Sequence, residues 1–206
     1  MSLTLFAALA LQSAPVGLDD IGVYDRAEHA QSITQCDALA AHPDDPEAVS
    51  PGIARADMDL EQAIEACLTA VESDPANPRL NYQLARAYGY SGLHSEGQPY
   101  RDTALRAGYP QSLFVVGYIR LTGWDGRGAD ACYGGELIRR SAEAGRFAGL
   151  VGFPSYALQG AFDECEAYPV LDNEEMLGFL DRAEDATQDF YRSKLIIHLR
   201  ARLQDQ

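Results

Sequence analysis

Hydrophobic residues recur with the period of an α-helix from about residue 60 to the end of the chain. The spacing i, i+4, i+7, i+8 and i+11 is met by Leu60, Ile64, Cys67, Leu68 and Val71. Residues at this spacing share one face of a helix. Asp57 or Asp59 can cap its start, and Pro75 prevents the helix from continuing. The pattern therefore predicts an amphipathic helix that begins near residue 60 and ends before residue 75.

Further helices are predicted by the same reasoning. One begins at Pro78, a favourable first-turn residue, and ends at Ser91-Gly92. Three more end at glycines that can act as C-caps: residues 95–107 before Gly108, 113–121 before Gly123 and 133–141 before Gly145. Two apolar stripes lie near the C-terminus, at residues 176–183 and 196–203. Sustained alternation of polar and apolar residues is absent from the sequence, so the predicted fold class is all-α.

The segment before these helices follows a different pattern. Residues 42–52 (HPDDPEAVSPG) are rich in Pro, Asp and Gly, which favour turns and exclude both a helix and a central strand. We therefore expect an irregular N-terminal region ahead of the helical part.

An internal repeat is visible in the helical part. Shifting the sequence by 37 residues sets Ala107-Gly108 on Ala144-Gly145, Leu113 on Leu150, Leu121 on Leu158 and Gly123 on Gly160. These identities fall at the helix ends and core positions that a helix-turn-helix repeat requires. A single such repeat cannot bury its apolar face, so stacked neighbours must complete the core.

Two groups of residues resemble known repeat families. The first group resembles the tetratricopeptide pattern and consists of Ala63, Cys67, Ala70, Pro75, Leu84, Ala85, Tyr88 and Ala104. The second group resembles the Sel1-like variant and consists of Ala107-Gly108, Gly117, Gly123, Asp130 and the run Arg140-Ser141-Ala142-Glu143-Ala144-Gly145. Residues 36–86 are also similar to uncharacterised exported proteins of Gram-negative bacteria that carry such repeats. The resemblance implies a right-handed α-solenoid of helix-turn-helix repeats.

This resemblance also implies a division of the chain into four parts. Residues 19–57 form an irregular capping region, 58–165 the tetratricopeptide- or Sel1-like repeats, and 166–206 a C-terminal capping helix pair. Residues 1–18 are interpreted either as a signal-peptide remnant or as an ordinary N-terminal segment. Their apolar run at positions 3–11 has the length of a signal-peptide core and is too short to span a bilayer, but no basic residue precedes Arg26.

Charge restricts the class of partner. The 206 residues include 16 Lys and Arg against 31 Asp and Glu, for a net charge of −15. Binding of nucleic acids depends on clustered Lys and Arg, and anionic membrane surfaces attract basic segments. The balance therefore argues against nucleic acid and against anionic membranes. We expect a protein or peptide partner.

Four cysteines suggest an oxidising compartment. Cys36, Cys67, Cys132 and Cys165 include no C-x-x-C pair, so the spacing of a zinc or thioredoxin-like site is missing. Three pairings are open to four cysteines. Because a solenoid contacts only adjacent repeats, we expect Cys36–Cys67 and Cys132–Cys165. Together with the apolar N-terminal run, they predict a periplasmic or secreted protein.

Candidate catalytic chemistry is sparse in the sequence. The four histidines are isolated, and no motif indicates a metal or another cofactor. The sequence therefore favours a non-enzymatic scaffold that docks a partner on the concave face of the solenoid. A periplasmic hydrolase with a carboxylate-based site and a regulatory appendage of a larger envelope enzyme remain as alternatives.

The predicted binding residues lie mainly on one helix. If Leu84, Ala85 and Tyr88 face the core, the groove is lined by Arg79, Tyr82, Arg86 and Tyr90, with Arg120 extending it. Arginine offers a bidentate fork for carboxylates, so these residues predict binding of an acidic segment or a free C-terminus. The alternative is that Arg79 and Arg86 pair with nearby Asp and Glu on the solvent side.

Overall fold

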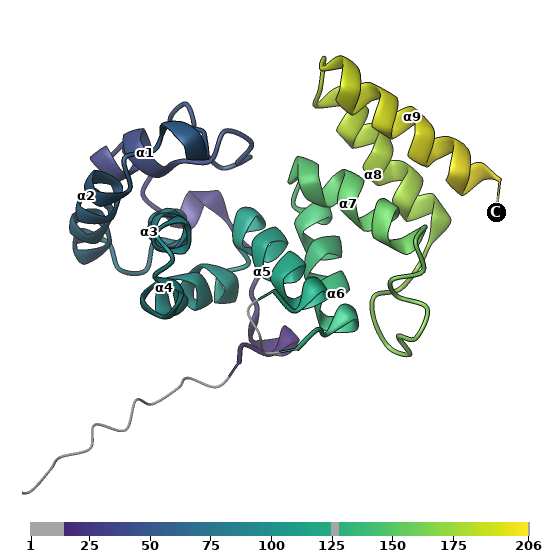
Figure 1. The fold of residues 1–206 in the computed structure, drawn as a ribbon, viewed down its shortest axis with the longest axis horizontal. Helices are drawn as coiled ribbons and strands as arrows, with labels where there is room; N and C mark the ends of the chain where they lie inside the picture. Colours follow the sequence, from purple (N-terminus) through teal and green to yellow (C-terminus); the bar gives the residue numbers. More distant parts are fainter. Residues whose placement is uncertain (1–14, 125–127, 206) are drawn as a thin grey trace, which may run out of the picture.

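The computed structural model describes residues 15–124 and 128–205, and every regular element in these ranges is helical (Figure 1). The α-helices are α1 (Gln35–Ala40), α2 (Leu60–Ser73), α3 (Pro78–Tyr90), α4 (His94–Arg106), α5 (Pro110–Thr122), α6 (Ala131–Glu143), α7 (Phe147–Ala157), α8 (Asn173–Asp185) and α9 (Phe190–Gln204). Short 3₁₀ turns are η1 (Leu18–Asp20), η2 (Arg26–Glu28) and η3 (Arg55–Asp57). The predicted all-α class is confirmed. The expected signal segment falls largely at positions 1–14, outside the described residues.

The helix ends follow the capping residues that the sequence offers. The Asp59 side chain accepts a hydrogen bond from the backbone N–H of Gln62 and caps α2, and Asp130 caps α6 through the N–H of Tyr133. Pro78 is the first residue of α3. Gly123 ends α5 with a φ of 66°, a conformation that glycine adopts without the strain of a Cβ atom.

Consecutive helices pack against each other along an arc, with α1 and α2 at one end and α8 and α9 at the other (Figure 1). The backbones of α5 and α6 approach closely where Gly117 and Gly134 face each other. A Cβ atom on Gly134 would lie 2.7 Å from the carbonyl oxygen of Gly117. The two backbones can therefore meet because both positions lack a side chain.

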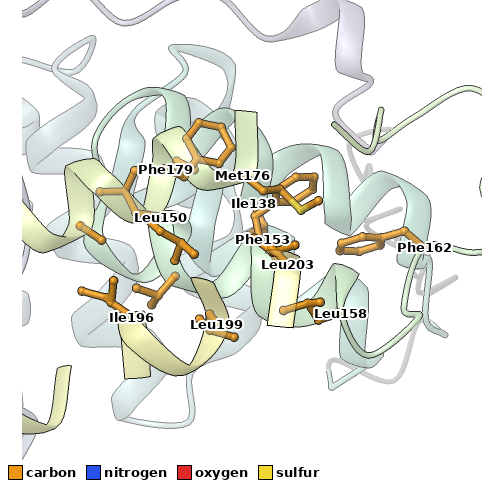
Figure 2. Packing of buried hydrophobic residues seen from close by; sticks show 14 residues of the cluster. Ile138, Leu150, Phe153, Leu158, Phe162, Met176, Phe179, Ile196, Leu199 and Leu203 are labelled. Atoms are coloured by element: carbon orange, nitrogen blue, oxygen red, sulfur yellow. The ribbon is translucent and has the colours of Figure 1, made fainter. Parts of the chain in front are cut away.

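Two large hydrophobic clusters stabilise the two ends of the arc. The C-terminal cluster joins α6 to α9 through Ile138, Leu150, Phe153, Leu180 and Ile196, all of which are fully or almost fully buried (Figure 2). The N-terminal cluster joins α1, α2 and α3 through Cys36, Ala63, Cys67, Leu80 and Leu84. Each cluster draws on helices that are neighbours in the sequence.

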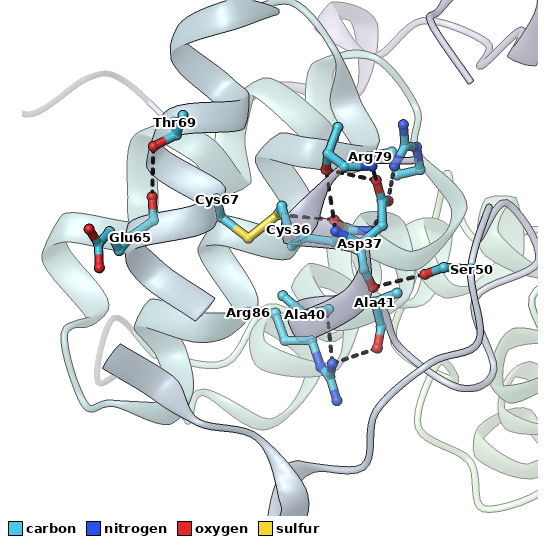
Figure 3. Close-up of a disulfide and its surroundings, with 12 residues drawn as sticks. Cys36, Asp37, Ala40, Ala41, Ser50, Glu65, Cys67, Thr69, Arg79 and Arg86 are labelled. Carbon is cyan, nitrogen blue, oxygen red and sulfur yellow. Dashed lines mark hydrogen bonds and ion pairs between the residues drawn. A yellow bond between two sulfur atoms is a disulfide. The ribbon is translucent and has the colours of Figure 1, made fainter. Parts of the chain in front are cut away.

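Both expected disulfides are confirmed. Cys36–Cys67 links α1 to α2 inside the N-terminal cluster (Figure 3), and Cys132–Cys165 links α6 to the segment that follows α7. The two bridges close loops of similar length, with sequence separations of 31 and 33. Each bridge joins elements that are close in the sequence.

The N-terminal region is irregular, as its composition predicts, but it is well anchored. Its backbone lies along the later helices, where the Tyr133 hydroxyl donates to the carbonyl of Val16 at 2.7 Å and the N–H of Gly22 donates to the carbonyl of Arg106 at 2.8 Å. Within residues 15–124 and 128–205, no helix is long and apolar enough to cross a membrane.

Candidate functional site

A cavity of about 260 Å³ lies between α3 and α5, with α4 and Trp124 completing its wall. Its lining residues are Tyr82, Ala85, Arg86, Gly89, Tyr90, His94, Arg101, Ser112, Val115, Ile119 and Trp124. We call this space the aromatic pocket.

Helical periodicity explains how the two main walls form. On α3 the lining residues 82, 85, 86 and 89 are spaced i, i+3, i+4 and i+7, which places them on one face. On α5 the lining residues 112, 115 and 119 follow the same rule. Gly89 keeps the space open, because a Cβ atom built at this position would meet no other atom within 4 Å.

The chemistry of the aromatic pocket is apolar with a positive bias. Tyr82, Tyr90 and Trp124 supply aromatic surface, while Arg86 and Arg101 supply positive charge. No Asp or Glu is among the described residues that line it. Trp124 is 70% exposed at the rim and contacts the ring of His94 edge to face, with 5.8 Å between the ring centroids. This arrangement suits a large apolar group beside a negative charge.

Three of the five predicted binding residues, Tyr82, Arg86 and Tyr90, line the aromatic pocket. The Arg86 guanidinium is already engaged by the chain itself (Figure 3). Its Nη1 donates to the carbonyls of Ala40 and Ala41 at 2.9 Å each, and its Nη2 donates to the carbonyl of Ile53 at 2.8 Å. The guanidinium also lies over the Tyr90 ring, 5.0 Å from the centroid. Arg86 therefore contributes charge to the pocket but holds the N-terminal region with its hydrogen bonds.

Arg79 lies elsewhere. It is 1% exposed and forms an ion pair with the fully buried carboxylate of Asp37 from α1 (Figure 3). Its Nη2 also donates to the carbonyl of Ala30 at 3.2 Å. The expectation that Arg79 lines the same groove as Tyr82 is therefore wrong. The alternative, an ion pair of Arg79 on the solvent side, is also wrong, because the ion pair with Asp37 is buried. Arg79 joins α3 to the N-terminal region from within.

Arg120 also lies apart from the aromatic pocket. Its Nη2 pairs with the Asp130 carboxylate at 3.5 Å, and its guanidinium lies 5.9 Å from the centroid of the Tyr133 ring. Both contacts direct Arg120 toward the start of α6. The expected continuous arginine stripe from α3 to α5 is therefore not formed.

A second group of polar residues, which the sequence did not reveal, surrounds the turn at positions 42–47. Asp45 is 7% exposed and accepts a hydrogen bond from the hydroxyl of Tyr109 at 2.7 Å. Burial raises the pKa of Asp45 to about 6, and the Tyr109 hydrogen bond partly offsets this shift. Burial, followed by the charges of Arg146 and Arg86, lowers the pKa of His42 to about 4. These residues come from an irregular segment with no periodicity, and only their Asp and Pro content was visible.

The alternative of a carboxylate-based hydrolase requires two carboxylic acids with raised pKa in one cavity. Burial raises the pKa of both Asp45 and Glu47. Glu47 lines a cavity of about 380 Å³ that Asp45 does not line, and it pairs with Arg26 at 3.4 Å. The two acids therefore do not share that cavity.

Among residues 15–124 and 128–205, no three His, Cys, Asp or Glu side chains gather into a group that could hold a metal ion. A wide groove of about 800 Å³ lies between residues 30–39, α2 and the start of α3, and it is lined by both polar and aliphatic side chains. The predicted binding residue Arg79 is among the residues that line it. The groove offers none of the aromatic surface of the aromatic pocket.

Comparison with known proteins gives no relative. No family model, no curated protein and no solved structure matches the chain.

Proposed function

We propose that this chain is a non-enzymatic protein- or peptide-binding scaffold of the cell envelope, periplasmic or secreted, built as a right-handed α-solenoid of tetratricopeptide- or Sel1-like repeats. The succession of packed helices and the two disulfides between neighbouring elements support this proposal. Disulfides persist mainly in oxidising compartments, which favours a location outside the cytoplasm.

The aromatic pocket carries the proposal. Trp, Tyr and Arg are enriched among the few residues that carry most of the binding energy at protein interfaces, and such residues cluster in well-packed pockets from which water is excluded. The cavity of about 260 Å³ accommodates one large apolar side chain, with the exposed Trp124 available to cover it. We therefore expect a partner peptide that inserts an aromatic residue or a leucine between α3 and α5.

The charge of the lining favours an acidic segment or a free C-terminus on the same partner. Arg86, whose side chain donates hydrogen bonds to backbone carbonyls and to the Tyr90 hydroxyl, provides a local positive field within a chain of net charge −15. Because the hydrogen-bond donors of Arg86 already bind backbone carbonyls, we expect this field to act at a distance and not through a bidentate grip.

The test fills the aromatic pocket without disturbing the fold. Gly89→Leu places a side chain into open space on the pocket wall, and Gly178→Leu makes the same change at an open position of α8. A partner peptide is first selected from a library of peptides bearing Phe, Trp or Leu near an acidic residue or a C-terminal carboxylate. Its affinity for each variant is then measured by isothermal titration calorimetry.

We expect Gly89→Leu to weaken binding at least tenfold and Gly178→Leu to leave it unchanged. Trp124→Ala should weaken binding by a smaller factor, because Trp124 forms the rim. Equal affinity of the Gly89→Leu and Gly178→Leu variants would reject the aromatic pocket as the binding site. Turnover of substrates in a hydrolase panel would instead favour the enzymatic alternative.

A further inference from the structure

The turn at residues 42–47 connects the two ends of the arc. In Figure 1 the chain that follows α1 projects toward the first turns of α7 and α9. Both Asp44 carboxylate oxygens accept hydrogen bonds from the Nη2 of Arg192, at 3.0 and 3.2 Å, across a sequence separation of 148 residues. The Arg192 guanidinium also lies over the ring of Phe147, 4.6 Å from its centroid. Asp44 is thus held at the start of α7.

The residue beside Phe147 is a buried arginine with unused donors. Arg146 is 4% exposed, and its Nε and Nη1 have no hydrogen-bond partner. The Phe114 ring lies 5.6 Å from its guanidinium, and the charges of Asp44, Asp45 and Arg192 all act on it. Buried donors without acceptors are unfavourable, so an oxyanion that reached the Nε and Nη1 of Arg146 would be stabilised.

We propose that Arg192, beside the buried Arg146, forms a carboxylate-binding site that Asp44 occupies within the chain, and that an acidic segment of a partner peptide takes the place of Asp44 and reaches the unused donors of Arg146. The turn therefore acts as an internal competitor on the inner face of the arc. The inference rests on the proposed peptide-binding function for the nature of the competing ligand. It concerns a site distinct from the aromatic pocket.

The position of the turn supports competition with an external ligand. The Asp44–Arg192 contact is partly solvent-exposed, with 33% and 40% of the two side chains accessible, so its release leaves no buried charge at these two positions. A tethered carboxylate has an effective concentration in the millimolar range, which suppresses the binding of a free peptide until the tethered group is removed. Loss of the Asp44 charge should therefore expose a site that is masked in the unmodified chain.

The experiment supplies the acidic turn as a separate peptide. The probe is Ala-His-Pro-Asp-Asp-Pro-Glu-Ala, the sequence of residues 41–48, acetylated and amidated, and binding is measured by isothermal titration calorimetry at low ionic strength. Asp44→Asn releases Arg192. Asp181→Asn is the matched control, because it removes an exposed carboxylate that pairs with Arg200 at 2.8 Å. A second peptide with Asn at both Asp positions, Gln in place of Glu and a free C-terminal carboxylate separates terminal from side-chain recognition.

We expect the Asp44→Asn variant to bind the acidic peptide at least fivefold more tightly than either the unmodified chain or the Asp181→Asn variant. Adding Arg192→Gln to Asp44→Asn should abolish this gain. The proposal is overturned if Asp44→Asn binds no more tightly than Asp181→Asn, or if the gain survives Arg192→Gln. Binding that remains sensitive to Gly89→Leu in that case would leave the aromatic pocket intact, so the two failures are distinguishable.

Discussion

Arg79 and Asp37 bury opposite charges between α3 and α1, with 1% and 0% of their side chains exposed. Removal of one member of a buried ion pair leaves the other charge uncompensated. We expect Arg79→Ala to lower the free energy of unfolding by about 3–5 kcal/mol in urea titrations. Arg200→Ala, which removes an exposed arginine paired with Asp181 and Glu184, should cost less than about 1 kcal/mol. Similar losses in the two variants would contradict this view of Arg79.

His42 and Asp45 respond to acid in opposite directions. The pKa of Asp45 is raised from 3.8 to about 6, so its burial costs stability at neutral pH and the cost is relieved as the pH falls through 6. The pKa of His42 is lowered from 6.5 to about 4, so its contribution is present above pH 6.5 and is lost as the pH falls toward 4. The two effects oppose each other between pH 6.5 and 4.

Single substitutions should separate these two effects. Relative to the unmodified chain, we expect Asp45→Asn to become less stable between pH 7 and pH 4.5, because the gain from Asp45 protonation is lost. His42→Gln should become relatively more stable over the same range. Urea unfolding at the two pH values measures both differences. If the free energy of unfolding of both variants changes between the two pH values by the same amount as that of the unmodified chain, the titration of Asp45 and His42 is not linked to folding as described.

Sequence reasoning succeeded at the residue level where a helix imposed its period. Tyr82, Arg86 and Tyr90 were predicted together because they recur every four residues along α3, and all three line the aromatic pocket. Arg79 was misplaced because its partner, Asp37, lies in a short helix outside the periodic region. The partners of Arg86 are backbone carbonyls, which carry no sequence signal at all.

Helices and their ends were largely predictable, because apolar spacing and capping residues act locally. The predicted start near residue 60 is confirmed, and of the two candidate caps, Asp57 and Asp59, it is Asp59 that caps α2. The course of residues 15–59 was not predictable, since long-range hydrogen bonds such as that from the Tyr133 hydroxyl to the Val16 carbonyl determine it. Local composition identified this region only as irregular.

The contact between α5 and α6 depends on glycine at position 134. A Cβ atom there would lie 2.6 Å from the backbone nitrogen of Leu121 and 2.7 Å from the carbonyl oxygen of Gly117. Backbone atoms of a helix cannot move away from the added methyl group as a flexible side chain could. We therefore expect Gly134→Ala to destabilise the protein by about 1–3 kcal/mol. Gly178→Ala, at an open position of α8, should instead stabilise it by about 0.5–1 kcal/mol.

Urea unfolding of the two alanine variants measures this difference. The comparison controls for the gain in helix propensity, since both substitutions replace glycine by alanine inside a helix. Equal stability of the two variants would show that α5 and α6 can separate without cost.

At the scale of the whole molecule, the turn at residues 42–47 joins the N-terminal cluster to the later helices. Asp45 receives a hydrogen bond from Tyr109, the residue just before α5, and Asp44 receives two from Arg192 in α9. Arg86 holds the backbone on either side of the turn, at Ala40, Ala41 and Ile53. The two ends of the arc are therefore linked by a segment that belongs to neither large hydrophobic cluster.

Tyr109→Phe should weaken the link between the turn at residues 42–47 and the later helices while the packing of the ring remains. The substitution removes the hydroxyl that donates to Asp45 at 2.7 Å and keeps the ring beside Tyr24 and Tyr82. A buried carboxylate that loses a donor costs about 1–3 kcal/mol, so the turn should open more often. Hydrogen exchange should then accelerate at the backbone N–H groups of Asp45, Ala48 and Ile53, which are bonded within this segment.

Tyr133→Phe is the control. It removes a hydrogen bond of the same length, to the carbonyl of Val16, and should leave those three amides protected. Unchanged exchange in the Tyr109→Phe variant would mean that Asp45 does not hold the turn against the later helices.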